Sequence, residues 1–362
     1  MKTVLLGDEI ELIGGGTPKT TNSAYWGGDI DWLSVVDFGG NSRWVKTAEK
    51  KITKEGLKNS STKLLYPGDI IISARGTVGE LAQLKVPMAF NQSCYGIRAK
   101  GNLDQDYLYY LLKLSISDLQ RQAHGGVFST ITRETFQHIK VQLPQRTAQQ
   151  QIANILGKID EKIELNRRMN ESLEQIGQAL FKHSFIDNPE AKTWIKGRLS
   201  DFTEVITGKG STKSVLAEGG KYPLYGAGGL MGTSDKYLLD DPVIITGRVG
   251  TLGKIQAVTG KAWFSDNVLI IKPKPSFFGF VYYLVRLVDF VSMNRGSSQP
   301  LVTQTDLKNH SVKTPDEKTI QEFESLFQAL FCLIQKGEKE IITLGKLRDS
   351  LLPRLISGKI KV

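Results

Sequence analysis

The chain has 362 residues, a formal net charge of +10 and a pI near 9.3. That length accommodates two cored domains, and the basic balance favours a polyanionic partner. With only Cys94 and Cys332, the chain can build neither a disulfide framework nor a four-thiolate metal site, which suits a reducing cytoplasm. The first residues, MKTVLLGDEIEL, meet acidic side chains by position 8, and no run approaches the roughly 20 apolar residues of a membrane span. Neither a signal peptide nor a membrane protein is expected.

The first module, residues 1–146, is predicted to consist mainly of strands and turns. The β-branched run IIIS (70–73) stops at the glycine-rich turn RGTVG (75–79), a pattern typical of a strand followed by a tight turn. A helix is expected at 104–122. Its Tyr109 and Tyr110 lie beside leucines at helical spacing, so they are expected to be core residues rather than platforms for nucleic-acid bases.

A long amphipathic helix is predicted next, over residues 147–187. A strict seven-residue repeat is typical of a left-handed coiled-coil seam. Its members here are Ile152, Ile159, Asn166, Leu173 and Leu180, and Ile155, Met169 and Ile176 are expected to complete the seam. Asn166 either fixes the register opposite Gly337 or faces solvent at a loosened centre.

The chain then repeats this organisation. Pro144 and Pro315 open similar helices 171 residues apart, and the same offset pairs Ile131 with Val302. The repeat predicts a second module over 188–316 and a second helix over 317–362. The seam of that helix comprises Phe323, Leu330, Leu344 and Leu351. To cover the first helix, the second must run back toward the first module, which makes the pair antiparallel.

The two modules keep an apolar framework and differ at their polar tips. GDIIISARGTVGELAQ (68–83) parallels DPVIITGRVGTLGKIQA (241–257), which pairs Arg75 with Arg248 across a one-residue shift. A helix carrying a second tyrosine pair is expected at 277–292. Differing tips are typical of two readers of different sites, although surface drift after duplication gives the same pattern.

Sequence motifs for catalysis are missing. The segment 247–254 fails the G-x4-G-K-[ST] phosphate loop, and GAGGLMG (226–232) lacks the last glycine of a dinucleotide fingerprint. The four histidines show no metal-ligand spacing. Asp69 and Glu80 are interpreted as turn and surface residues rather than nuclease carboxylates. The sequence therefore predicts a binding protein with no catalytic residues, no metal and no cofactor.

Four segments together resemble the specificity subunits of type I restriction–modification enzymes. They are IGGGTPKTTNSAYWGGDIDWLSVVD (13–37), GDIIISARGTVG (68–79), STITRETFQHIKVQLP (129–144) and LRDSLLPRLISGKIKV (347–362). The resemblance covers essentially the whole chain. It implies an α+β fold, with two pseudo-repeated mixed α/β target-recognition domains (1–146 and 188–316) separated by two long antiparallel coiled-coil helices (147–187 and 317–362).

The resemblance also implies the partners. They are double-stranded DNA with a split recognition sequence, two adenine-methylating (M) subunits and nuclease-translocase (R) subunits, in the cytoplasm and without a membrane. Each domain would read one half of the DNA site, the helices would set the gap, and a partner would flip out and methylate the chosen adenine.

Candidate DNA-contact residues are the polar and basic side chains of the module tips. Arg, Lys, Asn, Gln and Asp side chains can pair with base edges or phosphates. In the first module they are Thr17, Lys19, Arg75, Thr77, Asn91, Gln92 and Ser129; in the second they are Lys209, Lys213, Arg248, Thr251, Asp266, Asn267 and Gln299. Two alternatives stay open, namely an enzyme with its own nuclease or methyltransferase site, and a coiled-coil scaffold that binds protein.

Overall fold

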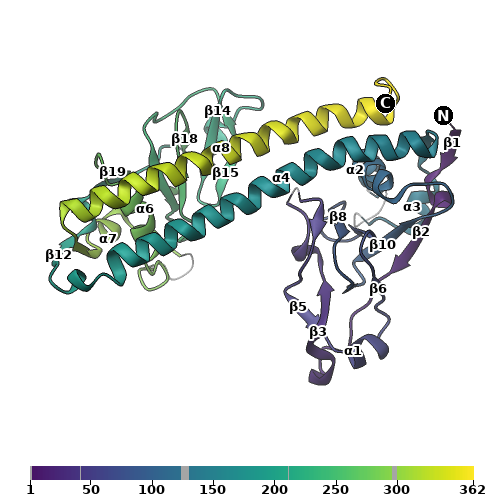
Figure 1. Ribbon diagram of the computed structural model, residues 1–362, viewed down its shortest axis with the longest axis horizontal. Coiled ribbons are helices and arrows are strands. Elements are labelled where there is room, and N and C mark those ends of the chain that lie inside the picture. The colour runs from purple at the N-terminus through teal and green to yellow at the C-terminus, as the bar shows by residue number, and fades with distance from the viewer. Residues whose placement is uncertain (1, 41, 124–129, 211, 296–299) are drawn as a thin grey trace. The chain divides into compact units, whose positions relative to one another are not determined.

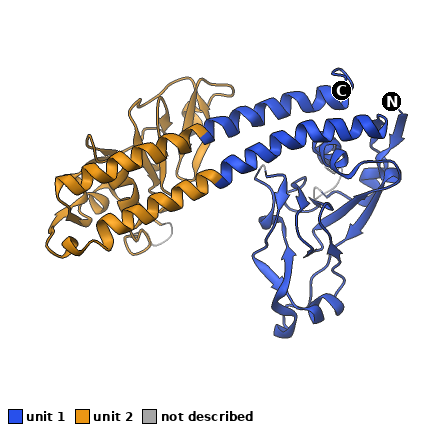
Figure 2. Cartoon of the chain, viewed as in Figure 1, with its two compact units in different colours: residues 1–168, 337–362 blue, residues 169–336 orange. Residues whose placement is uncertain are grey.

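The computed structural model describes residues 2–40, 42–123, 130–210, 212–295 and 300–362 (Figure 1). The chain divides into two compact units (Figure 2). Unit 1 is Met1–Arg168 with Gly337–Val362, and unit 2 is Met169–Lys336. Both units combine β-sheets with helices, as expected for a mixed α/β protein. No helix in the described ranges is long and apolar enough to span a membrane.

Unit 1 is built on a five-stranded sheet. Its strands, in spatial order, are β2 (Ile10–Gly14), β10 (Cys94–Ala99), β7 (Ile70–Ser73), β8 (Leu81–Leu84) and β4 (Trp44–Val45). A second sheet contains β5 (Lys50–Ile52), β3 (Trp26–Leu33), β9 (Met88–Phe90) and β6 (Leu64–Leu65), and β1 (Lys2–Leu5) pairs with β11 (Lys140–Leu143). The helices of this domain are α1 (Lys54–Lys58), α2 (Gln105–Ala123) and α3 (Arg133–Gln137).

The central sheet of unit 1 is buried on both faces. Alternating side chains of β7 point to opposite sides, so Ile70 and Ile72 join the core against α2, whereas Ile71 joins a core shared with the second sheet. A strand buried on both faces has no polar alternation. This explains why IIIS appears in the sequence as a continuous β-branched run.

Unit 2 repeats this plan with fewer strands. Its main sheet has the order β13 (Thr203–Thr207), β19 (Val268–Pro273), β16 (Val243–Gly247) and β17 (Gln256–Val258). Beside it lie the sheet of β15 (Gly229–Ser234), β14 (Tyr222–Gly226) and β18 (Trp263–Phe264), and the pair β12 (Ile195–Arg198) with β20 (Ser311–Thr314). Its short helices are α5 (Thr212–Val215), α6 (Phe278–Arg286) and α7 (Gln304–Lys308).

The helices after the sheets fit the sequence predictions in part. The pairs Tyr109–Tyr110 on α2 and Tyr282–Tyr283 on α6 are buried, which confirms them as core residues. The predicted helix at 277–292 is too long, because α6 ends at Arg286. Beyond it, the Asp289 carboxylate accepts the N–H groups of Val291 and Ser292, both at 3.1 Å, and forms a turn.

Two long helices follow the two sheet domains. They are α4 (Arg146–Phe181), which continues as a π-helical turn at Lys182–Ile186, and α8 (Glu317–Ile356). In unit 1, Asp160 contacts Arg348 and Lys162 contacts Glu340, so partner numbers fall on α8 as they rise on α4. The helix segments of unit 1 are therefore antiparallel.

The helix segments of unit 2 are antiparallel as well. The Asn170 side-chain amide donates to the Ile334 carbonyl at 3.2 Å, and the rings of Phe181 and Phe323 lie 5.7 Å apart. Partner numbers again fall on α8 as they rise on α4. Phe181 and Phe323 also belong to the aromatic core under α6.

The predicted seam positions are buried or half-buried, and Asn166 is only 1% exposed rather than solvent-facing. The prediction that Ile155, Met169 and Ile176 complete the seam is wrong, since these side chains are 38–48% exposed. Leu156 and Ile163, one residue later in the repeat, are buried instead. The buried and half-buried seam residues of α4 are spaced alternately four and three positions apart, as in Ile152, Leu156, Ile159 and Ile163. The second set of seam positions therefore lies one residue later than predicted.

Candidate nucleic-acid interface

Three loops of unit 1 leave the same end of the central sheet. Antiparallel pairing sets Gly14 opposite Tyr95 and Ser73 opposite Cys94, so β2 and β7 end where β10 begins. The loops after β2 and β7 and the turn before β10 therefore share one edge. They carry six of the predicted contact residues, namely Thr17, Lys19, Arg75, Thr77, Asn91 and Gln92.

Local hydrogen bonds shape these loops. The Thr17 hydroxyl donates to the Gln92 side-chain carbonyl, which joins the first loop to the turn before β10. The Asn91 side-chain carbonyl accepts the Ser93 N–H at 3.1 Å. Both amides thus stabilise the loops through their carbonyl oxygens, but Asn91 is half-buried whereas Gln92 is exposed. Of the two amides, Gln92 is better placed to reach a ligand.

The β7–β8 turn carries Arg75 and Thr77 at its exposed tip. Gly76 and Gly79 adopt φ values of +77° and +94°, which favour glycine, and the Ser73 hydroxyl accepts the Glu80 N–H at 2.8 Å. Within the described residues Arg75 forms no ion pair.

Unit 2 has the same arrangement. Thr207 pairs with Leu269 and Gly247 pairs with Val268, so β13 and β16 end where β19 begins. The loops at this edge carry Lys209, Lys213, Arg248, Thr251, Asp266 and Asn267, of which Lys213 lies on α5. All of these except the half-buried Arg248 are exposed. Ser129 and Gln299 lie outside the described residues.

Backbone hydrogen bonds correct one predicted equivalence between a residue of unit 1 and a residue of unit 2. Ala74 N donates to Ser93 O at 2.8 Å, and Ile131 N donates to Ala74 O at 3.0 Å. In unit 2 the residue with both contacts is Arg248, whose N donates to Asn267 O at 2.9 Å and whose O accepts Val302 N at 3.0 Å.

Arg248 is therefore the counterpart of Ala74, not of Arg75. The Ile131–Val302 pairing is confirmed. Since the two arginines differ in position by one residue along their turns, Arg75 is exposed and Arg248 is half-buried.

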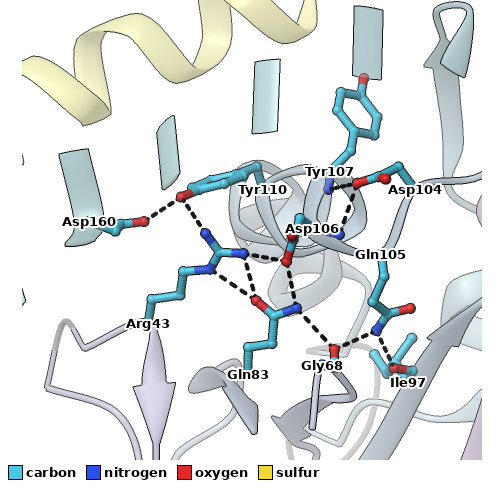
Figure 3. Close-up of polar contacts among 10 residues, drawn as sticks. All are labelled: Arg43, Gly68, Gln83, Ile97, Asp104, Gln105, Asp106, Tyr107, Tyr110 and Asp160. Atoms are coloured by element: carbon cyan, nitrogen blue, oxygen red, sulfur yellow. Dashed lines mark hydrogen bonds and ion pairs between the residues drawn. The ribbon is translucent and has the colours of Figure 1, made fainter. Parts of the chain in front are cut away.

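A buried polar network anchors the sheet domain of unit 1 to α4 (Figure 3). The Arg43 guanidinium donates to Gln83 Oε1 at 2.9 Å, to Tyr110 Oη at 3.1 Å and to Asp106 Oδ1 at 2.6 Å. The Tyr110 hydroxyl then donates to Asp160 Oδ2 at 2.6 Å. Burial, followed by the Asp160 charge, raises the pKa of Tyr110, so its hydroxyl remains a proton donor.

The network was missed by sequence reasoning. It ends on α8, where Arg348 Nη1 donates to Asp160 Oδ1 at 2.7 Å. Asp160 and Arg348 are buried, but neither occupies a heptad position predicted from the sequence, so the heptad pattern gave no signal for them. Asp69 also has a structural partner, the guanidinium of Arg98, at 2.7 Å. Among the described residues no group of three or more His, Cys, Asp or Glu side chains is arranged to hold a metal ion.

The fold thus defines a duplicated protein in which each unit presents polar loops at one end of a buried sheet and joins it to paired helices. The chain belongs to the family described as type I restriction modification DNA specificity domain, whose model matches residues 1–175 and 191–343.

Curated relatives and one solved structure are similar to the chain. The type I restriction enzyme MjaIX specificity subunit of Methanocaldococcus jannaschii is 29% identical over 97% of this chain and 91% of that protein. The EcoR124I/EcoR124II specificity subunit of Escherichia coli is 32% identical over 43% of this chain and 40% of that protein. The crystal structure of a type I S subunit from M. genitalium matches with a TM-score of 0.62 at 18% identity, over 98% of this chain and 96% of that one, and so shares the fold.

Proposed function

We propose that the chain is the DNA-specificity subunit of a cytoplasmic type I restriction–modification complex and that it reads a split DNA site. The observation that carries the proposal is the repeated loop cluster at one end of each central sheet. Each cluster would read one half-site. Membership of the specificity family supports DNA as the ligand.

The contact residues follow from the loop clusters. In unit 1, Gln92 suits an adenine edge and Arg75 suits guanine or phosphate; in unit 2, Asp266 suits the cytosine amino group. The remaining candidates would position the backbone of the duplex. They are Thr17, Lys19, Thr77, Asn91, Lys209, Lys213, Arg248, Thr251 and Asn267, with Ser129 and Gln299 kept as sequence-based candidates.

The paired helices would form an antiparallel coiled coil that sets the gap between the half-sites. Antiparallel contacts within each unit and the buried heptad positions support this role. In the domain plan we propose, residues 1–146 and 188–316 are the target-recognition domains, and residues 147–187 and 317–362 are the spacer helices.

Two methyltransferase subunits would dock on the helices, and restriction subunits would join them. An exposed apolar stripe next to the seam supports this docking. In unit 1, Ile155 and Leu347 lie one heptad from the ion-paired Lys162 and Glu340, and both side chains are more than a third exposed. In unit 2, the same heptad positions are occupied by Met169, Ile176, Leu326 and Leu333, which are 43–53% exposed.

The chain itself would carry out no chemistry, and the partner subunits would methylate or cleave the DNA. A footprint of the complex with methyltransferase subunits on a split site tests the proposal, and two protected blocks separated by an unread gap are expected. One uninterrupted protected block would contradict the proposal that two domains read separate half-sites. Turnover by the isolated chain would support the enzyme alternative, and salt-insensitive binding would support the protein scaffold.

A further inference from the structure

Tryptophan side chains hold the loop that follows β2 in unit 1. Trp32 Nε1 donates to the Gly16 carbonyl at 3.0 Å, and Trp26 Nε1 donates to the Lys19 carbonyl at 3.2 Å. The two rings meet edge to face, with centroids 5.2 Å apart, and Trp32 is only 6% exposed. The loop that carries Thr17 is therefore fixed at both ends through its backbone.

Unit 2 fixes the corresponding loop through one such hydrogen bond. After β13, the Lys209 carbonyl accepts a hydrogen bond from Trp263 Nε1 at 3.0 Å. The carbonyls of Lys209 and Gly16 are structurally equivalent, because Lys209 N donates to Phe264 O at 2.9 Å and Gly16 N donates to Phe90 O at 3.0 Å. Phe90 and Phe264 end the strands β9 and β18, which pair in parallel with β3 and β14.

The two tryptophans come from different strands of this parallel pair. Trp32 lies on β3, opposite Ala89 of β9, whereas Trp263 lies on β18, opposite Leu224 of β14. Simple inheritance from a common ancestor would place the tryptophan on the same strand in both units. In both units an indole N–H donates to the equivalent carbonyl, so the units share the hydrogen bond and not the position of the tryptophan in the sequence.

The held loop packs directly against the turn before the central strand. A Cβ on Gly15 would come within 2.0 Å of the Asn91 carbonyl oxygen, and a Cβ on Gly208 would come within 2.1 Å of the Ser265 carbonyl oxygen. Any shift of the loop therefore moves it relative to the neighbouring turn, which carries Gln92 in unit 1.

We propose that Trp32 and Trp263 are positioning residues for DNA readout, each for the half-site read by its own unit. Their indole N–H groups fix the position of one loop relative to the edge of the sheet. This loop bears Thr17 and Lys19 in unit 1 and Lys209 in unit 2. The rings pack against their neighbours, and the N–H group holds the loop at a fixed distance from the sheet edge. This inference rests on the proposed function.

The test uses the full chain in complex with its methyltransferase subunits. Trp32→Phe and Trp263→Phe keep an aromatic ring and remove the donor. The quantity measured is discrimination, defined as the methylation rate on the cognate site divided by the rate on sites with one base changed in one half. Each variant should lose about tenfold or more of its discrimination in one half-site, on the scale of one base contact. The other half-site should be unaffected, and the two variants should affect opposite halves.

Matched controls are Trp44→Phe in unit 1 and Trp194→Phe in unit 2. Trp44 stacks under the Lys85 ammonium at 3.5 Å, and Trp194 packs on Phe185. Neither indole N–H forms a hydrogen bond within the described residues, so discrimination should be unchanged in both controls. If Trp32→Phe fails to fold, β-(3-benzothienyl)alanine at position 32 preserves the ring size and still lacks the N–H.

Three results separate the possibilities. Loss of discrimination in one half-site per variant supports the positioning role. Equal losses in both half-sites, or weaker binding with unchanged discrimination, would assign the tryptophans a purely structural role and overturn the inference. Absence of sequence discrimination in the unaltered complex would instead overturn the proposed function.

Discussion

The Asp160 carboxylate accepts a hydrogen bond from the Arg348 guanidinium at 2.7 Å, and the two side chains are only 4% and 5% exposed. A buried ion pair costs desolvation energy, so its partners depend on each other. Because Asp160 also accepts the Tyr110 hydroxyl, this pair connects both long helices of unit 1 to α2.

Removal of one partner should destabilise unit 1 strongly. We expect Asp160→Ala to cost about 3–5 kcal/mol in the free energy of unfolding, because it leaves the buried Arg348 charge with only the exposed carboxylate of Asp349 as its partner. The double variant Asp160→Leu with Arg348→Met should recover most of that loss. Urea denaturation measures both, and equal losses in the single and double variants would contradict the explanation.

The control is the Lys162–Glu340 pair in the same helices. Its side chains are 45% and 41% exposed, with a separation of 3.6 Å. Exposed pairs are worth about 0–1 kcal/mol. Lys162→Ala should therefore change the free energy of unfolding by less than about 1 kcal/mol.

The stability of unit 2 should depend on pH through Glu324. This carboxylate accepts the Phe280 N–H at 2.7 Å, and burial raises its pKa above the usual range. The unfolded chain then loses the proton at a lower pH than the folded chain, so stability falls as pH rises from the ordinary glutamate pKa through the raised one. The melting temperature of the native chain relative to Glu324→Gln should decline over that window, as measured by calorimetry. A pH-independent difference would refute the assignment.

The readout in unit 2 should include Asp266. If its exposed carboxylate accepts the amino group of a cytosine, Asp266→Ala should relax discrimination at one base pair by about 1–3 kcal/mol. Methylation of a library of half-site variants measures this change. Asp235→Ala, which removes an exposed carboxylate outside the loop cluster, is the matched control.

The length of the helices should set the gap in the DNA site. One heptad inserted after Arg168 and another before Gly337 lengthen both helices by about 10 Å, the rise of about three base pairs. The preferred gap should increase accordingly, as read by methylation of sites with graded gaps. A heptad in α4 alone should impair binding, and an unchanged gap in the double insertion would exclude a spacer role for the helices.

The exposed stripe in unit 2 should bind a methyltransferase subunit. Leu333→Glu places a charge on an apolar side chain that is 49% exposed, so the partner should bind more weakly while the fold is retained. Val291→Glu, at an 83% exposed position off the long helices, is the control. Analytical ultracentrifugation with the methyltransferase measures the association, and equal binding by both variants would contradict docking at this stripe.

Much of the fold could be predicted from periodicity. The repeat at a constant offset located both long helices, and β-branched runs such as residues 70–73 marked the central strands. Heptad spacing alone could not decide between Ile155 and Leu156, because both are apolar and the choice depends on how the partner helix crosses. Burial resolves the choice in favour of Leu156.

The site was predictable only in outline. Loops that share a sheet edge follow from strand pairing, so most of the candidates fall into two clusters. The equivalence of Arg248 with Ala74 depends on backbone hydrogen bonds that a gapped sequence comparison does not contain. The contacts of the Arg43 network join residues 40 to 188 positions apart in sequence, and no local pattern encodes such contacts.

The two indole donors also constrain genetic exchange between the copies. A crossover between the coding regions of β3 and β9 that continues into the second copy would produce a domain with both Trp32 and Trp263, whose rings would compete for one carbonyl. The reciprocal product would combine Leu224 with Ala89 and leave that carbonyl without a donor. Viable recombinants should therefore exchange the whole segment from β3 to β9 as one block, so crossovers that give new DNA specificities would fall outside this segment.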